Sequence, residues 1–468
     1  MNIEDLYSQY LKSRRVSIDS RAVTENCIFF GLKGEHGDGG SYAAVALEHG
    51  ASLCVIENPE YKVDERCIVV DNSLKTLQDL SKYHRQHLDI PVIGITGTNG
   101  KTTTKELTNA VLSKKYKTWC TQGNLNNHIG VPLTILSTPE NTEVLIVEMG
   151  ANHPGEIEFL CNIANPDHGV ISNVGRAHLE GFGSFKGVVK TKCELYKHLA
   201  AMAGTIFVNA EDEILMERAE KFAVLPSIPS MLPGVVPPVP LAMQGRYGDD
   251  FKPRGVNMPM ASVVSYGNSD LAEYAGHSCG ANPYLEYVFV SNQKEIEVST
   301  RLFGEYNFPN AMAATCIGEF FGVNDDDIRS AIESYIPSNN RSQYIKTARN
   351  TVVLDCYNAN PSSMNAAINS FKTMKGENKV VFLGGMRELG ISSAKEHRSL
   401  FDLVASHNYD LVVLVGEEFK FAKGMSHTLW FPTSDDARKH FEDNPLSGKT
   451  ILLKGSNSNR MWVIEPAL

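Results

Sequence analysis

Residues 92–105 read Val-Ile-Gly-Ile-Thr-Gly-Thr-Asn-Gly-Lys-Thr-Thr-Thr-Lys, and this stretch decides the fold. An apolar strand runs into a glycine-containing turn, and a lysine followed by threonines then begins a helix. In this arrangement the backbone N–H groups of the turn and the helix N-terminus favour a bound phosphate. The strict P-loop pattern has a glycine where this chain has Ile95, so the motif is the shorter Gly97-x-x-Gly100-Lys101-Thr102.

This motif predicts a nucleotide-binding loop. We expect Lys101 to reach the terminal phosphates and the Thr102 hydroxyl to hold Mg²⁺. The expected phosphate-binding residues are Gly97, Thr98, Asn99, Gly100, Lys101, Thr102 and Thr103. The alternative is an ordinary strand–helix turn with an exposed lysine.

Length and composition indicate a multidomain globular protein. The chain has 468 residues, of which 42% are hydrophobic and 21% charged, which is long enough for two to four domains. It shows no apolar run of membrane-spanning length and no signal-peptide pattern, and its nine cysteines form no Cys-x-x-Cys pair. The net charge of −10 argues against non-specific nucleic-acid binding. We therefore expect a cytoplasmic protein without a membrane span or a nucleic-acid partner.

Three blocks of strands and helices follow one another along the chain. Residues 1–88 form a small α/β unit with short apolar strands at 27–31, 53–57 and 67–70. Residues 89–336 contain the phosphate motif and near-continuous apolar strands, which predict a central P-loop-type domain with a parallel sheet. Residues 337–468 repeat the alternation, with strands at 351–355, 379–383, 410–415 and 450–453. We expect an α/β protein of three domains whose C-terminal domain is doubly wound and Rossmann-like.

One segment breaks this alternation. Residues 221–260 contain eight of the 21 prolines of the chain, a density that helix and sheet interiors do not tolerate. The segment is predicted to be an irregular surface insertion in the central domain. Its apolar residues leave a partner-docking loop as the alternative reading.

Polar side chains follow two further apolar strands. Glu148 ends the strand at 144–149, and ligands of parallel α/β sheets sit at the carboxyl ends of strands. A carboxylate there is suited to coordinate Mg²⁺, although a helix-capping or salt-bridged glutamate is the alternative. His178 follows the strand at 169–174, and its position leaves a functional and a structural role open. Spacing alone does not distinguish Lys192 from Lys190 in the predicted helix that contains both.

Further motifs occur in chain order and resemble those of a known family. They are Gly123-Asn-Leu-Asn-Asn-His-Ile-Gly-Val-Pro132, Glu148-Met-Gly-Ala, Asn173-Val-Gly-x-Ala-His178-Leu-Glu, Lys192-x-Glu194, Phe303-Gly-Glu-Tyr-Asn307-x-x-Asn310-Ala, Asp355-x-Tyr-Asn-Ala-Asn-Pro361-x-Ser, Leu383-Gly-Gly-Met-x-Glu-Leu-Gly390 and Lys454-Gly-Ser456. With these motifs the chain resembles the Mur ligase family over nearly its whole length except 221–260. It is most similar to the type that adds D-alanyl-D-alanine to UDP-N-acetylmuramoyl-tripeptide.

The resemblance implies an ATP-dependent, ADP-forming ligase of peptidoglycan precursor synthesis. Such an enzyme forms an amide bond through an acyl-phosphate intermediate. Domain 1–88 would bind the UDP-sugar, domain 89–336 would bind ATP and Mg²⁺, and domain 337–468 would bring the incoming amine. The expected partners are these small molecules, and the expected oligomeric state is a monomer.

The resemblance also implies roles for individual residues. The implied catalytic residues are Lys101, Glu148, His178 and Lys192. The implied metal ligands are Thr102, Glu148, His178 and Lys192, the last as a carbamylated lysine. The implied ATP-binding residues outside the phosphate motif are Asn307, Asn310, Arg341 and Asp355. The implied substrate-binding residues are Ser20, Arg21, Asn124, Asn126, Asn127, Tyr357, Asn358 and Asn360.

The chain departs from the family pattern at two places. Tyr306 stands where many members have a histidine, and Ser456-Asn-Ser-Asn-Arg460 replaces the more usual Ser-Arg-Gly-Met-Arg. The second departure puts the contacts to the amine substrate in this tail in question.

Other functions remain open from the sequence. The chain resembles other Mur-type amino-acid ligases and folylpolyglutamate synthases less closely. The Asp-Asn-Pro-Arg motif of members that select diaminopimelate is missing, because Asp443-Asn-Pro is followed by Leu446. A nucleotide-dependent switch is the alternative from a different class, and it would hydrolyse ATP without a UDP-sugar.

Overall fold

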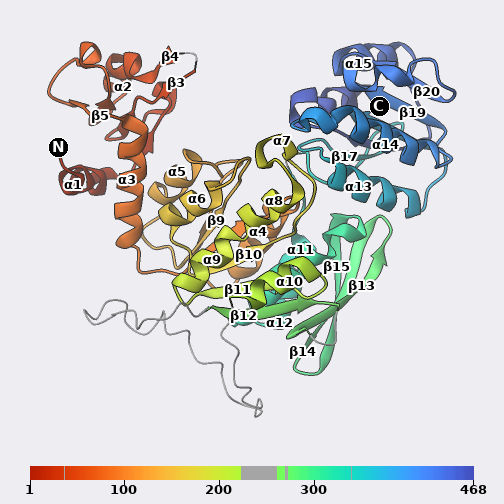
Figure 1. Cartoon of the computed structure of the whole chain (residues 1–468), viewed down its shortest axis with the longest axis horizontal. Helices are drawn as coiled ribbons and strands as arrows, with labels where there is room; N and C mark the ends of the chain where they lie inside the picture. The colour runs from red at the N-terminus through yellow and green to blue at the C-terminus, as the bar shows by residue number, and fades with distance from the viewer. Residues whose placement is uncertain (36, 223–260, 269–271, 339) are drawn as a thin grey trace.

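The computed structural model shows an α/β chain built on three large sheets (Figure 1). It describes residues 1–35, 37–222, 261–268, 272–338 and 340–468. Residues 223–260 of the Pro-rich segment lie outside the described residues, so its surface position stays a prediction. In Figure 1 the N-terminal and C-terminal sheets flank the central one. Among the described residues, no helix has the length and apolar character needed to span a membrane.

The N-terminal sheet is parallel and confirms the apolar strands expected there. Its order is β1-β2-β5-β6, with β1 (Val16–Ser17), β2 (Ile28–Phe30), β5 (Leu53–Ile56) and β6 (Cys67–Val69). A short antiparallel hairpin joins β3 (Lys33–Gly34) and β4 (Gly37–Asp38). The helices of this part are α1 (Ile3–Ser13), α2 (Ala43–Glu48) and α3 (Ser73–Gln86).

The central sheet is larger than the parallel sheet expected from the sequence. Its order is β15-β14-β13-β12-β11-β10-β7-β9-β8. The parallel part comprises β7 (Val92–Thr96), β8 (Thr118–Cys120), β9 (Val144–Glu148), β10 (His168–Ile171), β11 (Thr205–Asn209) and β12 (Ser262–Gly267). An antiparallel meander extends its edge through β13 (Tyr274–Ala281), β14 (Tyr284–Ser291) and β15 (Lys294–Phe303).

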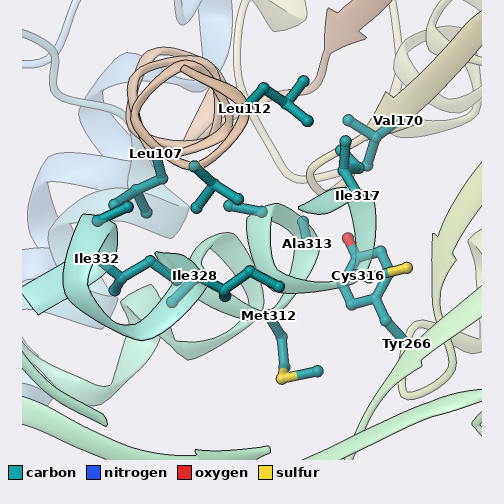
Figure 2. Packing of buried hydrophobic residues seen from close by; sticks show 14 of the residues in the cluster. Leu107, Leu112, Val170, Tyr266, Met312, Ala313, Cys316, Ile317, Ile328 and Ile332 are labelled. Carbon is teal, nitrogen blue, oxygen red and sulfur yellow. The ribbon is translucent and has the colours of Figure 1, made fainter. Parts of the chain in front are cut away.

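Helices cover both faces of the central sheet. On one face lie α4 (Lys101–Leu112), α11 (Phe308–Phe320) and α12 (Asp325–Ser334). Figure 2 shows their buried side chains packed together, with Leu107 of α4 facing Ile328 and Ile332 of α12. The helices in the remainder of this part are α5 (Gly130–Leu136), α6 (Glu156–Ala164), α7 (Leu179–Phe182), α8 (Phe185–Lys192), α9 (Glu194–Ala201) and α10 (Glu213–Glu220). This packing fixes the start of α4, which follows the phosphate motif.

The C-terminal sheet has the doubly wound arrangement that the sequence predicts. Its order is β16-β17-β21-β18-β19-β20, and only its edge strand β16 is antiparallel among the described strands. The strands are β16 (Gln343–Lys346), β17 (Thr351–Asp355), β18 (Lys379–Gly384), β19 (Leu411–Val415), β20 (Thr428–Phe431) and β21 (Thr450–Lys454). The helices are α13 (Pro361–Thr373), α14 (Ser393–Ala405) and α15 (Ser434–Asp443).

A buried arginine joins the end of α3 to the central sheet. The Arg85 side chain is 2% exposed, and its guanidinium donates to the carbonyls of Ala164 and Asn165 at 2.9 Å each. It also pairs with the Asp167 carboxylate at 3.1 Å. The same carboxylate accepts the backbone N–H of Val92, the first residue of β7, at 2.9 Å. Arg85 therefore supports the strand that leads into the phosphate motif.

We expect Arg85→Ala to destabilise this junction by about 3–5 kcal/mol, because it leaves a buried carboxylate without its cation. The measurement is hydrogen exchange of α3 and β7 together with thermal melting. Arg438→Ala is the control, since Arg438 is 45% exposed in a surface pair with Glu442 and should change stability by less than about 0.5 kcal/mol. Equal protection in both variants would contradict the role given to Arg85.

Candidate active site

Residues 97–102, which are the loop between β7 and α4 and the first two residues of α4, have the geometry of a phosphate-binding turn. Gly97 has a φ of 146° and Gly100 a φ of 77°, values that side-chain-bearing residues rarely adopt. A Cβ atom on Gly97 would overlap the Ser172 hydroxyl, and one on Gly100 would overlap the Asn310 amide. Both positions therefore require glycine, because the backbone has a positive φ and because there is no room for a Cβ atom. We call residues 97–102 the phosphate loop.

Lys101 is the first residue of α4 and bends back over the phosphate loop. Its Nζ donates to the carbonyl oxygens of Gly97 at 2.8 Å and Thr98 at 3.1 Å. Burial lowers the pKa of Lys101, while the nearby Glu148 carboxylate raises it. The ammonium group thus lies where phosphate oxygens would meet the loop.

Glu148 and Thr102 are brought together at the carboxyl end of β9, as the sequence predicts. Glu148 is 1% exposed, and its Oε2 accepts the Thr102 hydroxyl at 2.9 Å. Its Oε1 accepts the Asn126 side-chain amide at 2.8 Å. A buried carboxylate beside a threonine hydroxyl and a phosphate loop is a donor set that suits Mg²⁺. Within the described residues, no group of three or more His, Cys, Asp and Glu forms a metal cluster.

His178 stands at the start of α7 with a left-handed φ of 50°. Its Nδ1 hydrogen-bonds the carboxylate of Glu388, which lies in the connection that follows β18 in the C-terminal part. Burial, and to a smaller extent the nearby side chains of Lys101 and Lys192, lower the pKa of His178 to about 4. The imidazole is therefore neutral at pH 7, with Nδ1–H donated to Glu388 and the Nε2 lone pair left for a ligand. The His178 side chain is 26% exposed and that of Glu388 is 50% exposed.

Lys192, at the end of α8, is distinguished from Lys190 by its surroundings. Its side chain is buried and lies 5.7 Å from the Phe182 ring centroid, whereas Lys190 is exposed. Burial lowers the pKa of Lys192 well below its ordinary value, and the Lys101 cation lowers it further. In the part of the chain that the structure describes, its Nζ forms no ion pair.

One large cavity of about 990 Å³ lies between the central and C-terminal parts of the chain and is also lined by Leu74 and Gln78 of α3. The site residues predicted from the sequence that line this cavity are Thr98, Asn99, Gly100, Lys101, Thr102, Thr103, Asn126, Asn127, Glu148, His178, Asn307, Asn310, Arg341, Asp355, Tyr357 and Asn358. The lining residues not assigned a role from the sequence include Gln78, His153, Glu156, Tyr306, Ser342, Ser362 and Lys454. The cavity thus collects most of the predicted site residues of the central and C-terminal parts of the chain.

Some predicted site residues lie outside this cavity. Gly97, Asn124 and Lys192 are not part of its lining, and Asn360 lines a second cavity instead. Ser20 and Arg21 lie in the N-terminal part and line neither cavity, and the Arg21 guanidinium pairs with Asp19 at 2.8 Å on the surface. Their substrate-binding role stays a prediction.

The C-terminal wall of the large cavity contains a buried ion pair that sequence reasoning missed. Lys454 is 1% exposed, and its Nζ donates to the Asp355 carboxylate at 2.6 Å. The two residues are register partners on β17 and β21. Arg341 stacks over the Tyr357 ring at 3.6 Å from its centroid. The signal for Lys454 was a lysine at the carboxyl end of an apolar strand, the same criterion that selected Glu148.

The phosphate loop also contacts the C-terminal part directly. The side-chain amide of Asn360 donates to the Asn99 side chain at 2.7 Å. The backbone N–H of Arg176 donates to the Ser362 hydroxyl at 3.1 Å. These contacts hold the C-terminal wall against the phosphate loop, so the fold and cavity define a multidomain, nucleotide-binding α/β protein.

Comparisons with known proteins agree with this class. Three family descriptions match in chain order: "Mur ligase family, catalytic domain" at residues 12–92, "Mur ligase middle domain" at 95–227 and "Mur ligase, glutamate ligase domain" at 340–457. A curated relative is the UDP-N-acetylmuramoyl-tripeptide–D-alanyl-D-alanine ligase of Bacillus subtilis, 31% identical over 439 residues, which are 93% of this chain and 84% of the relative.

Solved structures show the same likeness. A crystal structure of MurF from Acinetobacter baumannii has a TM-score of 0.79 and 28% identity, covering 97% of this chain and 92% of that one. The MurF ligase of Thermotoga maritima, solved in complex with ADP, has a TM-score of 0.79 and shares the fold at 24% identity over 98% of this chain and 97% of that one. The chain belongs to the Mur ligase family, and within it to the MurF type.

Proposed function

We propose that this protein is an ATP-dependent ligase that adds D-alanyl-D-alanine to UDP-N-acetylmuramoyl-tripeptide in peptidoglycan precursor synthesis. The observation that carries the proposal is the single cavity that combines the phosphate loop, the Thr102–Glu148 pair and the Asp355–Lys454 wall. The reported curated relative is named for this reaction, which favours it over the other Mur-type ligations and over a switch.

The chemistry requires activation of a carboxylate, which is a poor acylating agent. Transfer of the γ-phosphoryl group of ATP to the tripeptide carboxylate gives an acyl phosphate, and phosphate then leaves when the amine attacks. Two anions must approach each other in the first step, so Lys101 is positioned to neutralise charge as it develops. The acyl phosphate would hydrolyse in water. The C-terminal wall contacts the phosphate loop and is therefore suited to exclude water from this intermediate.

The residues at the end of β9 fit a bound Mg²⁺. Thr102 and Glu148 would hold it, with Nε2 of His178 as a further candidate ligand. When bound, the ion would offset the negative charge of the ATP phosphates. Asn126 keeps the Glu148 carboxylate oriented through its 2.8 Å hydrogen bond.

Lys192 is proposed to carry a carbamate, by resemblance to the family. Reaction of its neutral amine with carbon dioxide forms an N–C bond, releases a proton and turns a cation into a carboxylate. The lowered pKa from burial supports this step because a protonated amine is not nucleophilic. The product would supply an anionic ligand near Lys101 and Glu148.

We propose that residues 1–88, 89–336 and 337–468 act as the UDP-sugar, ATP and amine domains. The separate sheets within these ranges support the division. Ser20, Arg21, Asn124, Asn126 and Asn127 are proposed to bind the sugar-peptide. The protein is proposed to act as a cytoplasmic monomer, with no nucleic-acid partner in view of its net charge of −10.

The test is phosphate release measured with each co-substrate omitted in turn. A ligase is expected to release phosphate at an appreciable rate only with ATP, UDP-N-acetylmuramoyl-tripeptide and D-alanyl-D-alanine all present, because each later step depends on the earlier one. Product formation is followed by mass spectrometry. Full ATP hydrolysis without the UDP-sugar would instead support the nucleotide-dependent switch.

A further inference from the structure

A second, smaller cavity of about 360 Å³ opens beside the large one. The two share His178, Tyr357 and Asn358 in their linings, so they adjoin at the edge of the catalytic cavity. A volume of this size is within the range of small-molecule sites. The cavity therefore offers room for a small molecule directly beside the catalytic cavity.

The walls of this cavity are mostly neutral and polar. They include Asn358, Asn360, Ser456, Asn457 and Ser458. Among the described residues that line the cavity, Arg387 is the one arginine or lysine. The Glu388 carboxylate next to it is already engaged by His178.

The Arg387 side chain is held in place but remains accessible. Its Nη1 pairs with Glu418 at 3.0 Å, and its Nε donates to the Ser458 hydroxyl at 3.3 Å. The side chain is 58% exposed, whereas that of Glu418 is 19% exposed. A guanidinium has five N–H donors, so these two contacts leave donors for a ligand carboxylate.

We propose that Arg387 binds the terminal carboxylate of the incoming dipeptide, an inference that rests on the proposed function. The dipeptide needs its amine near the acyl phosphate, and its far end carries a full negative charge. Arg387 brings a permanent positive charge to this cavity, and its contacts with Glu418 and Ser458 leave N–H donors for that carboxylate.

The test combines a residue change with a ligand change. Steady-state kinetics are measured for wild type and Arg387→Ala with D-alanyl-D-alanine and with its C-terminal amide, which has no carboxylate. We expect Arg387→Ala to raise the KM for the acid about 10- to 100-fold, the usual effect of losing a charged hydrogen bond. The KM values for ATP and the UDP-tripeptide should stay unchanged. With the amide, wild type and variant should perform alike.

Two further variants separate carboxylate binding from a structural role. Arg387→Lys keeps a cation and should restore part of the preference for the acid. Glu418→Gln breaks the same ion pair but keeps the guanidinium, so it should retain that preference. The inference is overturned if Arg387→Ala loses ligation activity equally with the acid and with the amide. It is also overturned if Glu418→Gln abolishes the preference for the acid as strongly as Arg387→Ala does. Failure of wild type to ligate either acceptor would refute the proposed function, and this inference with it.

Discussion

Lys101→Ala is expected to abolish ligation while leaving the fold intact. The Lys101 ammonium lies over the phosphate loop and contacts only backbone carbonyls there, so its loss removes charge stabilisation and little packing. Removal of one such electrostatic contact typically costs about 10²–10³-fold in rate, and a full cation at a transferring phosphoryl group should cost at least as much. The measurement is ligation rate at saturating co-substrates, together with a thermal melt.

A matched change on the same side of the central sheet provides the control. Lys114 follows α4 and is exposed, so Lys114→Ala should keep wild-type turnover. Near-normal turnover in a folded Lys101→Ala protein would refute the assignment of the phosphate loop.

Lys192→Ala is expected to be nearly inactive, and a small added carboxylate such as acetate or formate should restore part of the activity. The reason is that alanine leaves space where the proposed carbamate would stand, and a free carboxylate fills it. Activity titrated against carboxylate concentration is the measurement.

Lys190→Ala is the control for this second result. Lys190 belongs to the same helix but is exposed, so its removal should have little effect and show no rescue. Equal losses at both positions, or no response of Lys192→Ala to carboxylate, would count against carbamylation.

The sequence was sufficient to predict the parallel strands, but not the antiparallel strands at the edge of the central sheet. The strand expected at 351–355 is β17, because its apolar run is buried on both faces. The meander of β13 to β15 was missed, and β13 carries Gly276, His277 and Gly280, which interrupt any alternation. β15 does alternate, with Ile296, Val298 and Leu302 facing inward relative to their neighbours, so a period-of-two count would have found it.

The order of the motifs along the sequence was sufficient to locate the catalytic cavity. Contacts between residues far apart in the sequence could be found only from the structure. Glu148 follows a strand whose carboxyl end must meet the phosphate loop, so its position was predictable from topology. Glu388 lies 210 residues from His178 in sequence, and nothing local indicates their contact. The contact of Arg387 could not be predicted from the sequence for the same reason, because its partner Glu418 lies on another connection of the C-terminal sheet.

Ligation through an acyl phosphate moves one oxygen atom from the substrate carboxylate to the released phosphate, and oxygen-isotope transfer measures this directly. The tripeptide carboxylate is labelled with ¹⁸O at both oxygens, and the released phosphate is analysed by mass spectrometry after ligation with ATP and D-alanyl-D-alanine. Each released phosphate is expected to carry one ¹⁸O from the carboxylate, while the other ¹⁸O stays in the new amide. Unlabelled phosphate, or label appearing in AMP, would contradict ligation through an acyl phosphate.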